Sequence, residues 1–175
     1  MTQSALILEV PNAEPLVQEW RHRFDPVSLR GIPAHITVLV PFQPPADIDR
    51  STLDLLARLT SGIEPPSFSL VAVEEFPDAV WLRPEPADGL IRLTASVWSA
   101  FPDCPPYGGK FREPNPHLTM AQSTDPERLA EMRRELEPAV VHRLPLDCRI
   151  AALSLFVSDR STRWTLRQRF PFSGG

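Results

Sequence analysis

The sequence predicts an α+β fold built from two small sheets, antiparallel or mixed, each covered by helices. Strand-like and helix-like segments alternate along the chain. One short pattern also occurs twice: proline, a short spacer, histidine, an apolar residue, threonine and a second apolar residue. The copies lie near residues 35–38 and 117–120, about half the chain apart, which is typical of internal duplication within a single domain, here expected to cover residues 1–175.

The first half of the chain contains apolar alternation typical of strands and apolar spacing typical of helices. Proline pairs and single prolines separate these segments and set their ends. The elements expected here are a strand over residues 4–10, a helix from the candidate cap Asn12 to about Phe24, a loop through Pro33, the first histidine–threonine strand, a helix from Ser51 to about Ser61, and a hairpin of strands over 68–73 and 79–82.

The second half repeats this alternation around a long irregular stretch over residues 101–116, which contains five prolines. The run from Thr124 to Glu127 has the signature of a helix start, and Pro138 is expected to end that helix. The elements expected here are a helix from about Asp88 to Ala100, the second histidine–threonine strand, the helix from Thr124 or Asp125 to before Pro138, and strands within 144–157 and 163–170.

Composition and charge narrow the class of protein. The hydrophobic share of 42% and the charged share of 23% are ordinary for a globular domain, and no apolar run approaches the length of a membrane span. Cys104 and Cys148 do not make a disulfide framework, so we expect free thiols and a cytoplasmic location. A net charge of −4 argues against a DNA duplex as partner, although six arginines between His142 and Gly175 favour a small or terminal phosphate.

The two motifs place an imidazole and a hydroxyl on the same side of each strand, because successive side chains of a strand point to opposite faces. If the two faces oppose one another, one neutral histidine can remove a proton from an attacking oxygen, and one protonated histidine can give a proton to a leaving oxygen. The threonines Thr37 and Thr119 can donate hydrogen bonds to a tetrahedral anion between the histidines. This chemistry is that of in-line displacement at a phosphodiester.

The motifs His35-Ile36-Thr37-Val38 and His117-Leu118-Thr119-Met120 resemble the twin H-x-T-x signature of the two-histidine phosphoesterase superfamily. Within it, residues 33–42 resemble the first-motif context of the bacterial and archaeal 2′-5′ RNA ligase (RNA 2′,3′-cyclic phosphodiesterase) family. The resemblance implies a bilobal fold of two pseudo-symmetric sheets with the active site in the groove between the lobes. It also implies catalytic His35 and His117, phosphate-binding Thr37 and Thr119, and no metal or cofactor.

By the same analogy, the enzyme would hydrolyse 2′,3′-cyclic phosphate ends of RNA or cyclic nucleotides, with 2′-5′ RNA ligation as a related activity. His117 would activate water and His35 would protonate the leaving 3′ oxygen. Because the chain is acidic and has one lysine, we expect the partner to be a nucleotide or short RNA with a cyclic phosphate end, bound by a monomer.

Further substrate contacts are expected from aromatic and cationic residues, since any base can stack on an aromatic ring. The candidates are Phe42 after the first motif and Tyr107, Lys110, Phe111 and Arg112 in the irregular stretch. Core packing is the stronger interpretation for Phe42 and an equal one for Tyr107 and Phe111.

Two alternatives to a cyclic phosphodiesterase follow from the same residues. A binding module of this fold would hold an RNA end or nucleotide without efficient turnover, and a related hydrolase would cleave a non-RNA phosphodiester. A zinc site is disfavoured, because two imidazoles lack a third acidic or thiolate ligand at suitable spacing.

Overall fold

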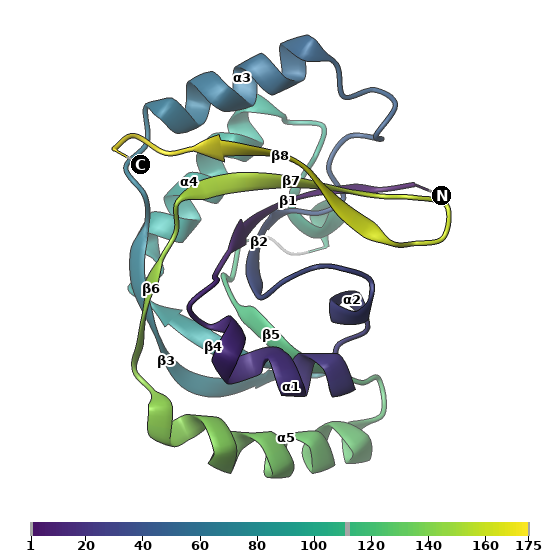
Figure 1. Ribbon diagram of the computed structural model, residues 1–175, viewed down its shortest axis with the longest axis vertical. Helices are drawn as coiled ribbons and strands as arrows, with labels where there is room; N and C mark the ends of the chain where they lie inside the picture. The colour runs from purple at the N-terminus through teal and green to yellow at the C-terminus, as the bar shows by residue number, and fades with distance from the viewer. Residues whose placement is uncertain (1, 111–112, 175) are drawn as a thin grey trace.

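The computed structural model describes residues 2–110 and 113–174 and confirms the α+β prediction (Figure 1). It contains two four-stranded sheets, and all strand pairs among the described residues are antiparallel. The first sheet has the order β2 (His35–Leu39), β1 (Ser4–Glu9), β7 (Ala152–Ser158) and β8 (Trp164–Pro171). The second has the order β5 (Leu118–Gln122), β4 (Ala79–Glu85), β3 (Ser67–Phe76) and β6 (Leu146–Arg149).

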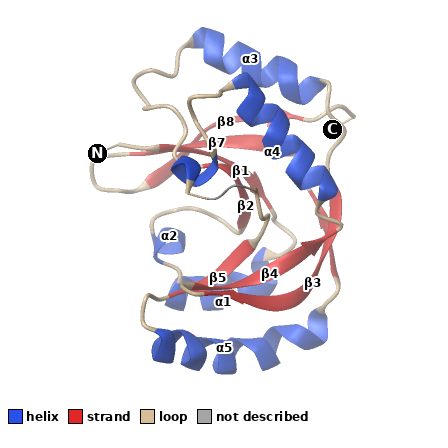
Figure 2. Ribbon diagram, turned by 180° about the vertical axis from the view of Figure 1, so that it is seen from behind, coloured by secondary structure: helices blue, strands red, loops and turns tan. Residues whose placement is uncertain are grey.

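Helices cover one face of each sheet, which gives the molecule two lobes (Figure 2). The helices α3 (Arg50–Ser61) and α4 (Asp88–Ala100) pack on the first sheet. The helices α1 (Glu14–Phe24) and α5 (Pro126–Val140) pack on the second. Shorter helical segments are α2 (Pro26–Leu29) and the 3-10 turns η1 (Pro106–Gly109) and η2 (Val141–Arg143).

The lobes do not correspond to the two halves of the sequence. Strand β7 from the second half pairs with β1 in the first sheet, and strand β3 from the first half pairs with β4 in the second sheet. Likewise, α1 follows a strand of the first sheet but packs against β5 of the second. One continuous cluster of buried apolar residues contains side chains of both sheets, so the lobes share a core.

Most expected elements are present, and the differences have local causes. The N-cap position of helix α1 is Ala13, without a side-chain cap, and the side-chain amide of the expected cap Asn12 instead donates to the main-chain carbonyl of Asp147. Helix α2 lies where a loop was expected, because the Asp25 carboxylate accepts a hydrogen bond from the Val27 amide at 3.2 Å and caps it. The expected strand region 144–157 is divided into β6 and β7, which belong to different sheets.

The predicted end of helix α5 before Pro138 is wrong, because the helix continues to Val140. An internal proline costs about 3 kcal/mol, but burial of Leu136 and Val140 contributes about 1.5–3 kcal/mol each. Both side chains are fully buried at helical spacing on either side of the proline. Apolar packing on the second sheet therefore outweighs the lost main-chain hydrogen bond.

Two expectations from composition can be compared with the structure. Cys104 and Cys148 are free thiols, as predicted, and Cys148 is buried. In the described parts of the chain, no helix is long and apolar enough to cross a membrane.

Candidate active site

The two motifs lie next to each other where the lobes meet. Strands β2 and β5 are edge strands of their sheets and contact each other across the junction. The alternation predicted from sequence is present: the histidine and threonine of each motif are half-buried, whereas their apolar neighbours are buried. His117 immediately precedes β5.

Each histidine is oriented by a main-chain carbonyl two residues before it. The Nδ1 atom of His35 lies 2.8 Å from the Pro33 oxygen, and that of His117 lies 2.7 Å from the Asn115 oxygen. Because a carbonyl can only accept, each Nδ1 carries the proton and donates it. Each neutral ring therefore has an unprotonated Nε2, the form needed to accept a proton.

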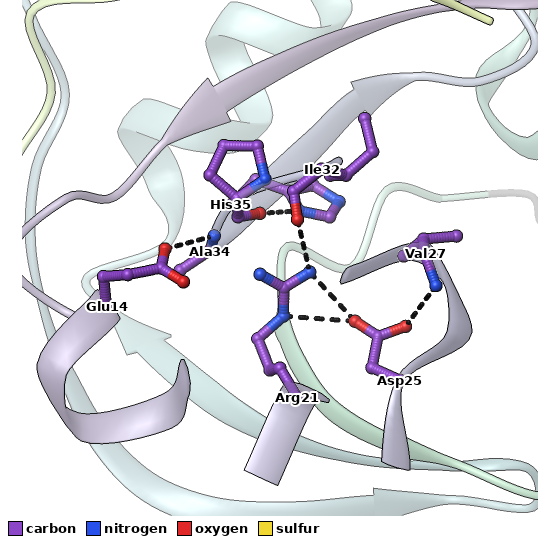
Figure 3. Close-up of polar contacts among 8 residues, drawn as sticks. Glu14, Arg21, Asp25, Val27, Ile32, Ala34 and His35 are labelled. Carbon is purple, nitrogen blue, oxygen red and sulfur yellow. Dashed lines mark hydrogen bonds and ion pairs between the residues drawn. The ribbon is translucent and has the colours of Figure 1, made fainter. Parts of the chain in front are cut away.

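Two side chains of α1, Arg21 and Glu14, hold the main chain of residues 32–34, which leads to His35 (Figure 3). Arg21 is fully buried and donates to the Asp25 carboxylate at 2.9 and 3.1 Å and to the Ile32 carbonyl at 3.2 Å. The Glu14 carboxylate accepts from the Ala34 amide at 2.7 Å. These contacts hold the chain on both sides of Pro33, whose carbonyl orients His35.

Burial lowers the pKa of His35 to about 3, and the nearby positive charge of Arg21 acts in the same direction. The Pro33 carbonyl and the Glu9 carboxylate oppose this shift. Glu9 lies opposite His35 in the β1–β2 ladder, but its charge is paired with Arg169 at 2.8 and 2.9 Å. His35 is therefore neutral at pH 7 in the unliganded protein.

His117 has different surroundings. Its ring lies against Phe76 (ring centroids 5.0 Å apart), Trp81 (5.8 Å) and Tyr107 (6.0 Å), and only Tyr107 is stacked on it. Burial lowers the pKa of His117, whereas the Asn115 carbonyl and the Asp78 carboxylate act to raise it.

Tyr107 links the two motifs. It stacks on the ring of His117, and its hydroxyl forms a side-chain hydrogen bond with Thr37. Burial raises the pKa of Tyr107 to about 12, so the phenol keeps its proton at neutral pH. The chain reaches this position through left-handed backbone at Tyr107 (φ 51°), Gly108 and Gly109, an arrangement that strand and helix patterns do not reveal.

A cavity of about 840 Å³ opens beside this centre. The second motif contributes His117 and Thr119 to its wall, and the segment after β2 contributes Val40 and Pro41. The other lining residues are Phe76, Pro77, Asp78, Ala79, Tyr107, Gly108, Lys110, Glu113, Asn115 and Gln122.

The expected further contacts have different outcomes. Tyr107 and Lys110 line the cavity. Phe42 is only 5% exposed and packs edge-on against Phe101, so it belongs to the core and is not available to stack on a base. Phe111 and Arg112 lie outside the described residues.

Sequence reasoning missed Arg21 and Glu9, and for Arg21 a signal was present. Arg21 stands four residues after buried Val17 and four before Asp25, so it falls on the buried side of the helix with an acidic partner one turn on. The arginines near the C-terminus do not gather at the site as free cations. Arg167 donates to main-chain carbonyls of Pro45 and Ile48, and Arg169 is paired with Glu9.

No group of three or more histidine, cysteine, aspartate or glutamate side chains in the described ranges is placed to hold a metal ion.

A sequence model of the 2′-5′ RNA ligase superfamily matches residues 9–162, a range that includes both motifs. The chain belongs to the 2′-5′ RNA ligase superfamily. This match confirms the resemblance predicted from the two H-x-T-x motifs. A search of curated protein sequences gave no match.

Solved structures share the fold over nearly the whole chain. E. coli LigT complexed with 3′-AMP is 16% identical with a TM-score of 0.59, and 98% of each chain is covered. E. coli LigT complexed with ATP is 18% identical with a TM-score of 0.60 and 99% coverage of each chain. TT0787 of Thermus thermophilus is 17% identical with a TM-score of 0.61 and 98% coverage of each chain.

Replacing His35 by glutamine should make the free energy of unfolding less sensitive to acid. The folded protein holds the pKa of His35 at about 3, whereas an unperturbed histidine titrates near pH 6.5. The contribution of neutral His35 to the free energy of unfolding is therefore fully present above pH ~6.5. It is lost as pH falls toward 3, because the unfolded state then binds a proton that the folded state excludes. Between pH 7 and 5 the contribution lost is about 2 kcal/mol.

Urea denaturation at pH 7 and pH 5 measures this difference. His22→Gln changes an exposed histidine on α1 and is the matched control, which should keep the acid sensitivity of the wild type. Equal acid sensitivity of His35→Gln and the wild type would show that the fold does not hold His35 neutral.

Proposed function

We propose that this protein is a metal-independent phosphodiesterase that hydrolyses 2′,3′-cyclic phosphate ends of RNA or cyclic nucleotides. The observation that supports it is the paired orientation of His35 and His117. In both rings a main-chain carbonyl holds Nδ1 and leaves Nε2 to accept a proton; His35 begins the edge strand β2, and His117 immediately precedes the edge strand β5, which contacts β2. Two such imidazoles can transfer protons to and from opposite sides of a phosphorus atom.

In the proposed reaction, water attacks the phosphorus of the cyclic diester as one ring P–O bond breaks. One histidine takes the water proton at Nε2, and the other supplies a proton to the departing ribose oxygen. Each positioned proton transfer contributes about 10²–10⁴-fold. Thr37 and Thr119 donate hydrogen bonds to the non-bridging oxygens, where negative charge is concentrated in the transition state.

The site takes up the required proton from solvent when the anionic substrate binds. Burial keeps both histidines below their ordinary pKa in the unliganded protein. An anionic phosphate bound between them favours the charged imidazolium and raises the pKa of whichever ring contacts it. The site therefore holds one proton when the substrate is bound.

The charges of the cavity support a small substrate. Lys110 is accompanied there by the carboxylates of Asp78 and Glu113, so the cavity wall does not favour several phosphates in a row. The half-buried ring of Phe76 can stack on a base. E. coli LigT forms complexes with 3′-AMP and with ATP, which supports a nucleotide or short RNA end as partner.

Several further expectations stay predictions within this proposal. The same acid and base can act with a 5′ hydroxyl in place of water as the nucleophile, so 2′-5′ ligation remains a related activity. A monomeric state, a cytoplasmic location and an origin of the two motifs by internal duplication rest on the sequence. A non-RNA phosphodiester is the substrate to test next if RNA ends are not cleaved.

The reaction class is tested by phosphorus NMR of the protein with 2′,3′-cyclic AMP and with a short RNA ending in a 2′,3′-cyclic phosphate, both in excess EDTA. Conversion to a single monophosphate is expected in EDTA, because side chains perform the proton transfers. His35→Ala and His117→Ala should each lower kcat by about 10²–10⁴-fold. The control His22→Ala should keep the wild-type rate.

Activity that is lost in EDTA and restored by zinc or manganese would contradict the metal-independent mechanism. Binding of 3′-AMP by a folded protein that converts neither substrate would instead identify a binding module.

Replacing Thr37 or Thr119 by valine should lower kcat while the fold is kept, because each change removes one donor to the developing charge. The expected loss is about 10²-fold for each variant. Thr165→Val, at an exposed position of β8, is the matched control. Steady-state kinetics measures the loss of kcat, and thermal denaturation checks that the fold is kept. Unchanged kcat in both variants would show that the threonines do not act at the phosphate site.

A further inference from the structure

The short turn η1 contacts one motif strand and leads into the other motif. It lies in the long connection between α4, which packs on the first sheet, and β5 of the second sheet, and its Pro106 is buried. It also contacts β2, and a Cβ atom added at Gly108 would lie 3.9 Å from Cδ of Pro41. The turn therefore packs against the segment of the first motif, although it precedes the second motif in the chain.

Tyr107 is the residue of this turn that contacts both motifs. Its ring stacks on that of His117, with centroids 6.0 Å apart and an angle of 18° between the ring planes. Its hydroxyl forms a hydrogen bond with the side chain of Thr37. The side chain is half-buried and lines the cavity. One residue thus contacts a candidate catalytic imidazole of the second motif and a candidate phosphate-binding hydroxyl of the first.

The backbone at Tyr107 indicates a functional constraint. Its φ angle of 51° lies in the left-handed region, which costs free energy for a residue that carries a side chain. Gly108 and Gly109 follow with φ angles of 62° and 78°, where glycine has little such cost. A non-glycine residue keeps this backbone only where its surroundings hold it, and such residues gather at active sites. The contacts of Tyr107 with His117 and Thr37 are of this kind.

The direction of the hydrogen bond follows from the task of Thr37 in the proposed reaction. A threonine hydroxyl has a single proton, and that proton is needed for a non-bridging oxygen of the substrate. The Thr37 oxygen must then accept from Tyr107. The phenol is able to donate, because burial raises its pKa to about 12 and it keeps its proton at neutral pH. Hydrogen bonds in such a chain, here from Tyr107 to Thr37 and from Thr37 to the phosphate, strengthen one another.

The two motifs differ in this support. Thr119 of the second motif lines the same cavity as Tyr107. Tyr107 is the single tyrosine of the chain, so no second phenol can do for Thr119 what Tyr107 does for Thr37. A substitution at Tyr107 therefore has different consequences for the two threonines, and this difference can be measured.

We propose that Tyr107 is a positioning residue of this site, which directs the Thr37 hydroxyl toward the substrate phosphate and holds the ring of His117 in its plane. The inference rests on the proposed phosphodiesterase activity. Tyr107 acts through Thr37 and His117 and makes no bond to the reacting atoms. This role is distinct from stacking on a base, in which Tyr107 would contact the substrate directly.

Tyr107→Phe keeps the ring and removes the hydroxyl, so it tests the bond to Thr37. We expect kcat for 2′,3′-cyclic AMP to fall about threefold to tenfold, which is the effect of one neutral hydrogen bond. In a Thr37→Val background, the same change should alter kcat by less than about twofold, because the hydroxyl through which Tyr107 acts is absent. In a Thr119→Val background, which is the matched control, the full loss should remain.

Three results would overturn the role through Thr37. These are a wild-type kcat in Tyr107→Phe, an equal loss in all three backgrounds, and a higher KM with unchanged kcat, which would make Tyr107 a substrate contact. Thermal denaturation checks that each variant is folded.

Tyr107→Leu removes the ring as well and tests the stack on His117. Its kcat should lie a further threefold or so below that of Tyr107→Phe, and this additional loss should persist in the Thr37→Val background. Equal kcat values for the Phe and Leu variants would overturn the part of the proposal that concerns His117.

Inorganic phosphate tests the positioning role without turnover, and it has no base on which Tyr107 could stack. Titration calorimetry should give a dissociation constant for phosphate about threefold higher in Tyr107→Phe than in the wild type. The same change should have no effect in the Thr37→Val background. An unchanged dissociation constant in Tyr107→Phe, or no phosphate binding by the folded wild type, would overturn the proposal. Phosphate binding without turnover of any cyclic phosphate would instead refute the proposed function alone.

Discussion

The contact on which the site depends most is the hydrogen bond from each histidine Nδ1 to the carbonyl two residues earlier. It joins each ring to the proline-containing turn before the strand, selects the tautomer with the proton on Nδ1 and leaves Nε2 to accept a proton. For His35, the turn is itself held by Arg21 at the Ile32 carbonyl and by Glu14 at the Ala34 amide. Without these contacts, the ring could rotate and the acid–base pair would lose its geometry.

The exchange of elements between the lobes brings the two motifs together. Because β2 and β5 are edge strands, each has one unpaired side along which the other lobe can approach. Helix α1 follows strand β1 of the first sheet but packs against β5 of the second sheet. This packing places Arg21 at the junction. Tyr107 completes the contact by stacking on His117 and bonding to Thr37. A near-symmetric pair of motifs thus lies in an asymmetric electrostatic environment.

The sequence predicted the features that depend on local patterns. Period-two alternation located His35 and Thr37 on one face, and the twin motifs indicated the superfamily. Features that depend on tertiary packing were not predictable in this way. The continuation of α5 through Pro138 follows from burial against the second sheet, and the core position of Phe42 follows from its contact with Phe101. The burial of Arg21 depends on its ion pair with Asp25.

The central claim is that His35 and His117 act in the same chemical step, and the double variant His35→Ala/His117→Ala tests it most directly. Residues that act as a unit give strongly non-additive losses, because removal of one already abolishes the concerted proton transfer. We predict that kcat for 2′,3′-cyclic AMP in the double variant equals that of the slower single variant within about threefold. Losses that multiply, or a single variant with the wild-type rate, would contradict the account.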